Sequence, residues 1–326
     1  MVDKYNREIK YLRISLTELC NLRCRYCMPM EGITKINHDD TLTYEEILMA
    51  VKVAAKLGFT KIRLTGGEPL IKKDIIKLAS EIKQVDGIDE LCITTNGLLL
   101  KKYAKDLKEV GVDRLNISLD TLNEDKYRYI TRVGELKNAL DGLDEAISVG
   151  FRRIKINSVL IGGFNDDEIV DLSSLTLDKN IDVRFIELMP MYDSGDFKEN
   201  AFVDSKIVID RLQEKFGKEN VNPVTDNKHK GSVAKLYRIN DSEALVGIIS
   251  PVSNHFCNEC NRIRLTSDGK LKPCLHSNEE ISIKGLDEKE MEDRFMMAIS
   301  HKPKQHDVLS YKCRSNANRN MNEIGG

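Results

Sequence analysis

Three cysteines near the start of the chain, Cys20, Cys24 and Cys27, lie close together in the run CNLRCRYC. Thiolates are the usual ligands of a [4Fe-4S] cluster, which contains four irons. Three thiolates from one loop therefore leave one iron open to a small molecule. A structural zinc loop or three unrelated buried thiols are the alternatives, but closed zinc sites use four protein ligands, and no fourth Cys or His lies close by. We predict a reactive cluster at this loop.

A second group of cysteines occupies one later segment and consists of Cys257, Cys260 and Cys274. His255 and His276 flank this group, so on spacing alone a Cys3His zinc site is favoured over a cluster. Residues 261–265 alternate as a strand does, which places Arg262 and Arg264 on one face beside the metal. Guanidinium groups match phosphate oxygens in bidentate fashion, so this face predicts an anion site.

The composition excludes several classes of protein. The 326 residues include 50 Lys and Arg against 52 Asp and Glu, so no global field attracts nucleic acid or an anionic membrane. No apolar run reaches the ~18 residues of a membrane span, and the N-terminus MVDKYNREIK lacks the apolar core of a signal peptide. We therefore expect a cytoplasmic protein. Six of its eight cysteines lie in two tight groups, which favours metal or cluster ligation over disulfides.

Short β-rich runs alternate with helical stretches from residue 11 to about residue 189. This alternation is typical of parallel strands joined by right-handed crossovers. The predicted strands cover 11–16, 61–65, 91–95, 114–119, 153–160 and 183–188. The predicted helices cover 44–57, 73–84, 100–110, 136–149 and 166–179, and Thr43 with Glu46 forms a capping box before the first.

The unusual residues follow these strands at their carboxyl ends. They are the first cysteine loop, Gly66-Gly67-Glu68-Pro69, Thr94-Thr95-Asn96-Gly97, Ser118-Leu119-Asp120 and Glu187-Leu188-Met189-Pro190. Ligands bind at this face in parallel β/α barrels, so the segments should converge on one cavity. Six repeats predict an α/β fold, an incomplete and laterally open (β/α)6 TIM-like barrel over 1–195. Residues 196–326 are predicted as an α+β region with a helix near 205–216 and strands near 234–240 and 245–250.

Taken together, these segments resemble the GTP 3',8-cyclase family of radical S-adenosylmethionine (SAM) enzymes, which opens molybdenum cofactor biosynthesis. The resemblance runs nearly end to end and rests on RISLTELCNLRCRYCMP, IRLTGGEPL, TTNG, NISLD, KINSVL, RFIELMPM, CNECNRIRLTSDGKLKPCL and the terminal Gly325-Gly326. It implies a barrel of the radical SAM type and a C-terminal region that carries a second [4Fe-4S] cluster with an open iron, in place of zinc.

The resemblance also assigns roles to matching positions. Cys20, Cys24 and Cys27 would hold the SAM cluster, and Cys257, Cys260 and Cys274 the substrate cluster. The SAM contacts would be Tyr26, Gly67, Ser118 and Met189, although Tyr26 and Met189 taken alone suit core positions equally well. Glycine suits position 67 because the methionine moiety of SAM must approach the backbone closely. The GTP contacts would be Arg13, Arg63, Thr94, Lys155, Arg262, Ile263 and Arg264, and the Gly325-Gly326 tail would reach into the active site.

Charge supports the list of GTP contacts independently, because most of its members are cationic. Arg13, Arg63 and Lys155 fall inside predicted barrel strands, where an unpaired charge is costly to bury. A solvated surface charge is the usual alternative, and here both interpretations stand. Outside the two groups, Cys92 is expected to be a buried strand thiol and Cys313 an ordinary one.

The implied reaction is the SAM-dependent cyclisation of GTP to (8S)-3',8-cyclo-7,8-dihydroguanosine 5'-triphosphate. No acid or base is assigned to it. The product would pass to cyclic pyranopterin monophosphate synthase, and neither nucleic acid nor a membrane is an expected partner. A homodimer is carried as an expectation. Two other classes remain open: a different radical SAM enzyme with an auxiliary cluster, for example a peptide-modifying one, and a non-enzymatic zinc or iron–sulfur protein.

Overall fold

Six parallel strands, paired in the order of the chain, form the centre of the fold. They are β1 Tyr11–Ser15, β2 Lys61–Thr65, β3 Glu90–Thr95, β4 Arg114–Ser118, β5 Ile154–Leu160 and β6 Asp182–Glu187. The computed structural model describes residues 1–33, 36–191, 197, 201–225, 233–310, 315 and 317–325. All six predicted strands are confirmed, with ends shifted by one residue at most.

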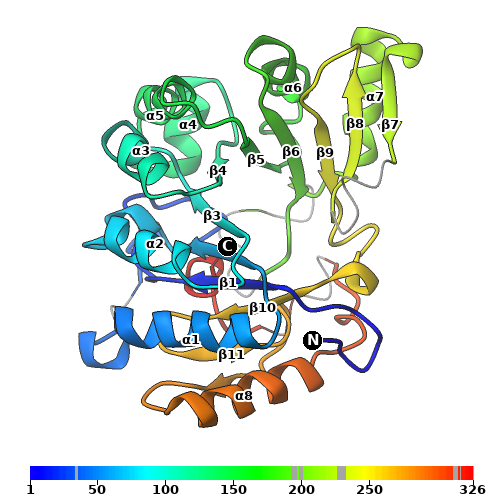
Figure 1. The fold of residues 1–326 in the computed structure, drawn as a ribbon. Coiled ribbons are helices and arrows are strands. Elements are labelled where there is room, and N and C mark those ends of the chain that lie inside the picture. Colours follow the sequence, from blue (N-terminus) through cyan, green and yellow to red (C-terminus); the bar gives the residue numbers. More distant parts are fainter. Residues whose placement is uncertain are drawn as a thin grey trace.

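Helices cover the outer side of the sheet to which these strands belong (Figure 1). They are α1 Tyr44–Lys56, α2 Ile75–Lys83, α3 Leu100–Glu109, α4 Glu124–Thr131, α5 Leu136–Ser148, α6 Ile169–Asp178, α7 Lys206–Phe216 and α8 Glu288–Ser300. The predicted capping box at Thr43 and Glu46 is present, and it satisfies main-chain N–H groups that the first turn of α1 leaves without partners. Apolar residues spaced three and four apart face inward, as in α5 with Leu136, Ala139 and Leu143.

Strands from the last third of the chain extend the same sheet at both edges. They are β7 Val221–Val224, β8 Lys235–Ile239, β9 Val246–Ile249, β10 Arg262–Leu265, β11 Lys270–Lys272 and β12 Ile281–Ser282. The sheet order is β12-β11-β10-β1-β2-β3-β4-β5-β6-β9-β8-β7, in which β10 runs parallel to β1 and β9 parallel to β6. The described sheet keeps two separate ends, so the predicted open, incomplete barrel is confirmed. The boundary at residue 195 stays a prediction.

Several elements were not predicted. α4 is preceded by the N-cap residue Asn123, whose side chain accepts a hydrogen bond from the Lys126 N–H. α8 packs beside α1 at the outer face (Figure 1). The short strands β7, β11 and β12 were also missed. The expected helix 166–179 starts at Ile169 instead, and no helix in the described residues is long and apolar enough to cross a membrane.

Candidate active site

One cavity of about 980 Å³ lies inside the partial barrel. All six cysteines of the two groups line it, together with every predicted SAM and GTP contact except Ile263. Ile263 is fully buried in the hydrophobic core, so its side chain lies outside the cavity. The cavity also includes Lys61, Glu90 and Arg114, which begin their strands. It therefore extends beyond the carboxyl-end face that barrel architecture predicts, because charged side chains replace the apolar filling inside the barrel.

The first cysteine loop is fixed by main-chain contacts to α4. The N–H groups of Arg23 and Arg25 donate to the carbonyls of Thr131 and Ile130 at 3.1 and 2.9 Å. Arg132 Nη1 returns to the loop and donates to the Arg23 carbonyl at 2.8 Å and to the Met28 carbonyl at 3.0 Å. α4, which sequence reasoning missed, thus anchors the loop that carries the three thiols.

The turn after β2 packs directly against the first cysteine loop. The Gly67 N–H donates to the Thr17 carbonyl at 2.6 Å, and the Glu68 N–H donates to the Leu19 carbonyl at 2.8 Å. A Cβ on Gly67 would lie 2.2 Å from the Leu19 carbonyl oxygen. Position 67 therefore requires glycine because the cysteine loop approaches it closely. This is a different reason from the close approach of SAM that we expected.

Glu68 joins three segments beneath the cavity. Its fully buried carboxylate accepts hydrogen bonds from Thr95 Oγ1 and the Asn96 N–H, each at 2.7 Å, and from the Leu70 N–H at 3.1 Å. Burial raises the pKa of Glu68 to about 7 in spite of these donors. The Asn96 side chain then donates to Asn21 Oδ1 at 2.7 Å, beside Cys20. Glu68 thereby couples the third strand to the cysteine loop.

The predicted SAM contacts lie around the same end of the cavity. Tyr26 donates a hydrogen bond to Asp120 Oδ2 at 2.7 Å, and burial raises the pKa of Asp120 to about 6. Ser118 is the last residue of β4 and stands in register with Asn157 on β5. Met189 packs against a small apolar cluster that includes Ile324. Tyr26 and Met189 are thus half-buried packing residues that also face the cavity, which agrees with both of the interpretations kept open.

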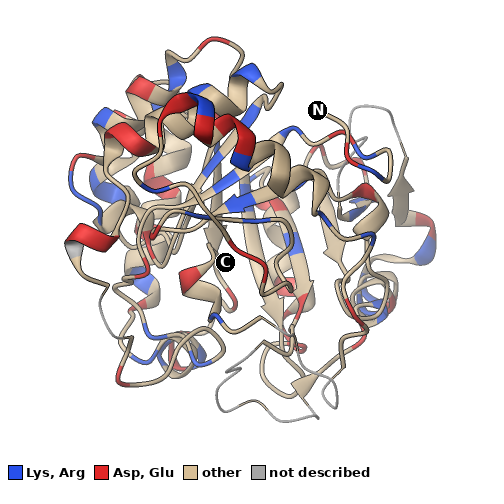
Figure 2. Cartoon of the chain, turned by 90° about the horizontal axis from the view of Figure 1, so that it is seen from below, with Lys and Arg blue, Asp and Glu red and all other residues tan. Residues whose placement is uncertain are grey.

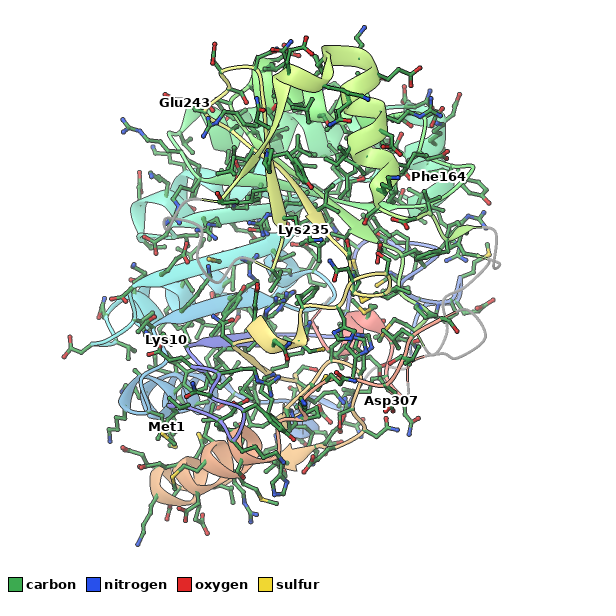
Figure 3. All side chains as sticks on the ribbon, turned by 90° about the vertical axis from the view of Figure 1, so that its right-hand side faces the viewer. Met1, Lys10, Phe164, Lys235, Glu243 and Asp307 are labelled. Carbon is green, nitrogen blue, oxygen red and sulfur yellow. The ribbon has the colours of Figure 1, made fainter. Side chains whose placement is uncertain are left out.

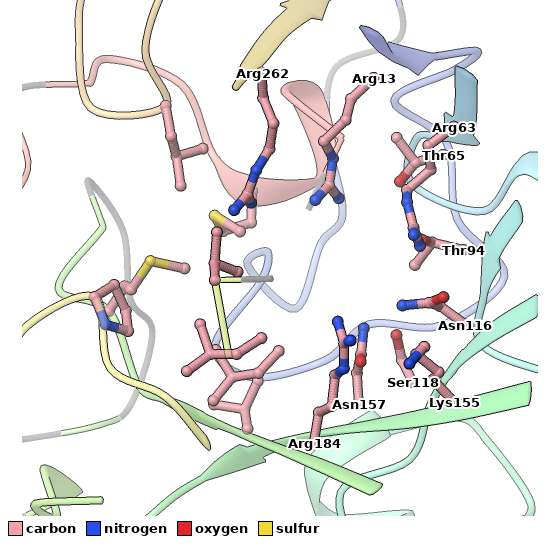
Figure 4. Close-up of a pocket in the computed structure, with 18 of the residues that line it drawn as sticks. Arg13, Arg63, Thr65, Thr94, Asn116, Ser118, Lys155, Asn157, Arg184 and Arg262 are labelled. Carbon is pink, nitrogen blue, oxygen red and sulfur yellow. The ribbon is translucent and has the colours of Figure 1, made fainter. Parts of the chain in front are cut away.

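Cationic side chains form much of the cavity wall. Arg264, Arg13 and Arg63 stand in register on the neighbouring strands β10, β1 and β2. Arg13 and Arg262 enter the cavity from one side, and Arg184 enters from the opposite side (Figure 4). Seen from below, Lys and Arg occupy the central strands as well as the outer helices (Figure 2). The predicted placement of these charges inside strands is confirmed.

Burial lowers the pKa values of these cations. It lowers the pKa of Arg13, with the Arg264 charge adding to the effect, and it lowers the pKa of Arg184 and of Arg264 to about 10 each. Lys155 forms an ion pair with Asp182, yet burial and the Arg184 charge lower its pKa to about 8. Because like charges meet in a poorly solvated space, the wall favours a highly charged anion.

Arg184 was missed by sequence reasoning. It lies on β6, lines the cavity, and its buried Nε has no hydrogen-bond partner in the described part of the chain. The signal that selected Arg13, Arg63 and Lys155, a cation inside a parallel strand, would have selected Arg184 as well.

The C-terminal tail enters the cavity wall. Arg13 Nη2 and Arg264 Nη1 each donate to the Gly325 carbonyl at 2.9 Å, and Arg264 Nη1 also donates to the Ile324 carbonyl at 2.9 Å. Gly325 has φ +72°, and a Cβ there would lie 2.6 Å from Thr65 Cγ2, so both conformation and space require glycine. Gly326 and Cys313 lie outside the described residues. The tail and the predicted GTP contacts therefore share two arginines.

The second cysteine group is held from two sides. Arg7, in the N-terminal segment, donates to the Cys257 carbonyl at 2.8 Å and forms an ion pair with Asp3 at 2.7 Å. Lys302, which follows α8, donates to Cys260 Sγ at 3.4 Å. Burial raises the pKa of Cys260, but Lys302 and Arg262 outweigh it and lower the pKa to about 7. Figure 3 shows Met1, Lys10 and Asp307 in the same half of the molecule.

The donor chemistry fits two clusters. All six thiols are free and half-buried, and Cys92 is a buried strand thiol as expected. Burial raises the pKa of Cys20 to about 11 and that of Cys27 to about 12, so these thiolates need a strong cationic partner. Iron supplies that charge. Within the described ranges, no three His, Cys, Asp or Glu side chains are grouped to hold a single metal ion.

Comparison with known proteins covers the whole chain. The Radical SAM superfamily profile matches residues 14–175, and the profile for Molybdenum Cofactor Synthesis C matches residues 181–308. The GTP 3',8-cyclase of Alkaliphilus oremlandii is 48% identical over 100% of both chains. The GTP 3',8-cyclase of Peptoclostridium acidaminophilum is 47% identical over 100% of this chain and 98% of its own.

Solved structures show a similar fold at low identity. Streptococcus suis SuiB bound to S-adenosylmethionine gives a TM-score of 0.63 at 16% identity, over 86% of this chain and 64% of that chain. The protein anSMEcpe with bound AdoMet gives a TM-score of 0.62 at 15% identity, over 97% of this chain and 90% of that chain. At these identities the likeness concerns the fold alone.

An open parallel barrel with a C-x3-C-x2-C loop after its first strand defines a radical SAM enzyme. The sequence identity to the GTP 3',8-cyclases covers both halves of the molecule. The chain belongs to the GTP 3',8-cyclase family. Its cofactors are SAM and two [4Fe-4S] clusters, so the zinc interpretation of the second cysteine group is set aside.

Proposed function

We propose that this protein converts GTP to (8S)-3',8-cyclo-7,8-dihydroguanosine 5'-triphosphate in the first step of molybdenum cofactor biosynthesis. The observation that carries the proposal is the single cavity that holds both cysteine groups, with a cationic wall between them. A SAM site and a site for a nucleoside triphosphate can then face each other across one cavity.

The proposed roles are those that the family resemblance implies, and the shared lining of one cavity supports them. Cys20, Cys24 and Cys27 would hold the first cluster, which would supply the electron for the reductive cleavage of SAM that starts the reaction at C3' of the ribose. Tyr26, Gly67, Ser118 and Met189 surround SAM at that end. Cys257, Cys260 and Cys274 would hold the second cluster, and the guanine would bind beside it.

The cationic wall positions the triphosphate. Arg13, Arg63, Lys155, Arg262 and Arg264 present donors from four strands, and Arg184 adds one from a fifth. Thr94 accepts from Arg63 Nη1 at 2.8 Å and so orients that guanidinium. Ile263 contributes packing beneath this wall, since its side chain is buried in the core. Fixed donors on the cavity wall would hold C3' near SAM and C8 near C3', and this positioning is the main contribution of the protein.

Anaerobic turnover tests the proposal. The reconstituted enzyme with SAM, dithionite and GTP should release 5'-deoxyadenosine and the cyclised nucleotide together, and iron analysis should give about eight irons per chain. SAM cleavage without a nucleotide product would refute the substrate assignment while retaining the class of enzyme. Calorimetry with GTP, on the parent and on Arg262→Ala, separates this reaction from peptide modification, which predicts no affinity for a nucleotide.

The remaining assignments are part of the same proposal. The barrel occupies 1–195 and the region with the second cluster occupies 196–326. The protein works in the cytoplasm, and the product passes to cyclic pyranopterin monophosphate synthase. A homodimer is the expected assembly, and sedimentation of the anaerobic holoenzyme tests it.

A further inference from the structure

Lys302 is a buried cation to which the reaction above gives no role. Its side chain is 2% exposed, although it follows directly on the last turn of α8. Its ammonium group donates to the Arg262 carbonyl at 2.8 Å, the Pro273 carbonyl at 2.9 Å and Cys260 Sγ at 3.4 Å. A lysine has three N–H donors, so each of them has one acceptor.

These acceptors belong to the two segments that carry the second cysteine group. Arg262 is the first residue of β10, Cys260 lies two residues before it, and Pro273 directly precedes Cys274. Lys302 therefore joins the two segments at the point where both approach the cavity. Arg7 fixes the chain beside Lys302, because its guanidinium donates to the Pro303 carbonyl at 2.7 Å and the Lys304 carbonyl at 3.1 Å.

The charges of Arg7 and Lys302 are balanced differently. Arg7 has the carboxylate of Asp3, whereas no carboxylate of the described residues pairs with Lys302 within 4.0 Å. A buried ammonium with only neutral partners is strongly destabilising. The anion that compensates it must come from the cysteines. A cubane of charge +2 on three thiolates carries a net charge of about −1, and reduction makes this more negative.

We propose that Lys302 is a positioning residue and counter-ion of the second cluster, and that it raises the reduction potential of this cluster. The inference rests on the proposed assignment of Cys257, Cys260 and Cys274 as ligands. A nearby positive charge and a hydrogen bond to a ligand sulfur both stabilise the reduced form, which holds one more negative charge. Lys302 also holds Cys260 and Cys274 at a fixed separation, so the open iron faces the cavity.

The test compares Lys302→Met with the parent as full-length, anaerobically reconstituted proteins. Potentiometric titration followed by electron paramagnetic resonance distinguishes the clusters, because SAM perturbs the signal of the first and GTP that of the second. At a fixed potential, the reduced-to-oxidised ratio of the second cluster should fall about tenfold in Lys302→Met, equivalent to ~59 mV for one electron. The first cluster should keep its potential.

Two further variants separate charge from structure. Lys304→Met removes the same charge two residues away at an exposed position and should leave both potentials unchanged. Lys302→Gln keeps a donor but no charge, so its shift should lie between the parent and Lys302→Met. An unchanged potential of the second cluster in both Lys302 variants would overturn the inference.

A measurement on the unaltered protein covers the case in which the variants do not fold. With 15N-lysine incorporated, pulsed resonance on the reduced second cluster should detect a 15N coupling, because Lys302 Nζ lies 3.4 Å from the ligand sulfur. Absence of this coupling would overturn the inference about Lys302 and leave the ligand assignment intact. A parent that binds only four irons per chain would instead refute the ligand assignment, and the inference with it.

Discussion

The substitution Gly67→Ala tests how tightly the turn after β2 supports the first cysteine loop. Its new Cβ would lie 2.2 Å from the Leu19 carbonyl oxygen and 2.6 Å from the Glu18 oxygen. Real Cβ atoms essentially never approach closer than 3.0 Å, so the loop must retreat by about 0.8 Å. Both obstacles are main-chain atoms, which cannot rotate aside. The residue that must move, Leu19, directly precedes Cys20.

We expect this displacement to disturb both the binding of the first cluster and the cleavage of SAM. Overpacking of this kind typically costs ~1–3 kcal/mol, and a misplacement of about 1 Å can reduce a rate roughly 100-fold. Gly67→Ala should therefore lose most of the first cluster and lower the rate of SAM cleavage about 100-fold or more, while the second cluster remains. Iron and sulfide analysis, with cluster-resolved electron paramagnetic resonance, should show about four irons fewer per chain.

Gly163→Ala is the matched control for a general loss of stability. Gly163 has φ +69° and no atom within 4 Å of a new Cβ, so the substitution strains the backbone by ~1–2 kcal/mol without a clash. It should retain both clusters and the parental rate. If Gly67→Ala assembles a full first cluster and cleaves SAM at the parental rate, the proposed packing requirement at this turn is wrong.

Three further predictions concern buried charges. GTP affinity should fall as pH rises past about 8, where Lys155 loses its proton, and Lys155→Arg should remove this dependence on pH. Equal GTP affinity below and above that pH would contradict the assignment of Lys155 as a GTP contact. Between pH 4.5 and about 7 the folded protein keeps a proton on Glu68 that the unfolded chain has lost. The free energy of unfolding should therefore fall with rising pH, by up to about 1.4 kcal/mol per unit, and Glu68→Gln should lose this slope in thermal denaturation. Arg7→Met leaves Asp3 buried without its partner and should lower the free energy of unfolding by ~3–5 kcal/mol, measured by chemical denaturation. Adding Asp3→Asn to this variant should restore part of the loss. Equal stability of the single and double variants would exclude the ion pair as the cause.

The sequence predicted the central strands well because buried parallel strands are continuous apolar runs bounded by turn residues. The missed strands have weak local signals. β11 and β12 have three and two residues, and β7 contains Pro223, which is typical only of edge strands and does occupy an edge here. Their pairing depends on distant partners, which periodicity within one segment cannot identify.

The residues of the candidate site also differ in whether a local sequence pattern identifies them. The cysteines stand out because several ligands come from one short loop. Lys302 has no such neighbours: it lies in the polar run HKPKQH, typical of an exposed turn, and its contact with Cys260 spans 42 residues. The glycine requirement at Gly67 was found, but its cause became visible only when the cysteine loop was in place. Sequence motifs therefore indicate the candidate ligands, whereas the residues that position these cysteines become visible only from tertiary contacts.

The pairing of β10 with β1 constrains when this enzyme can mature. β1 emerges early in synthesis, but its neighbour β10 comes from the last third of the chain, and the Arg7 contact with the Cys257 carbonyl spans 250 residues. A contact of such long range is slow to form, so the β1 edge of the nascent barrel stays unpaired until β10 has been synthesised. The first cysteine loop also receives the Asn322 side chain at the Glu18 carbonyl, close to the C-terminus. Cluster delivery is therefore expected only after β10 and Asn322 have been synthesised, and a ribosome stalled before residue 262 would hold an exposed strand together with unprotected thiols.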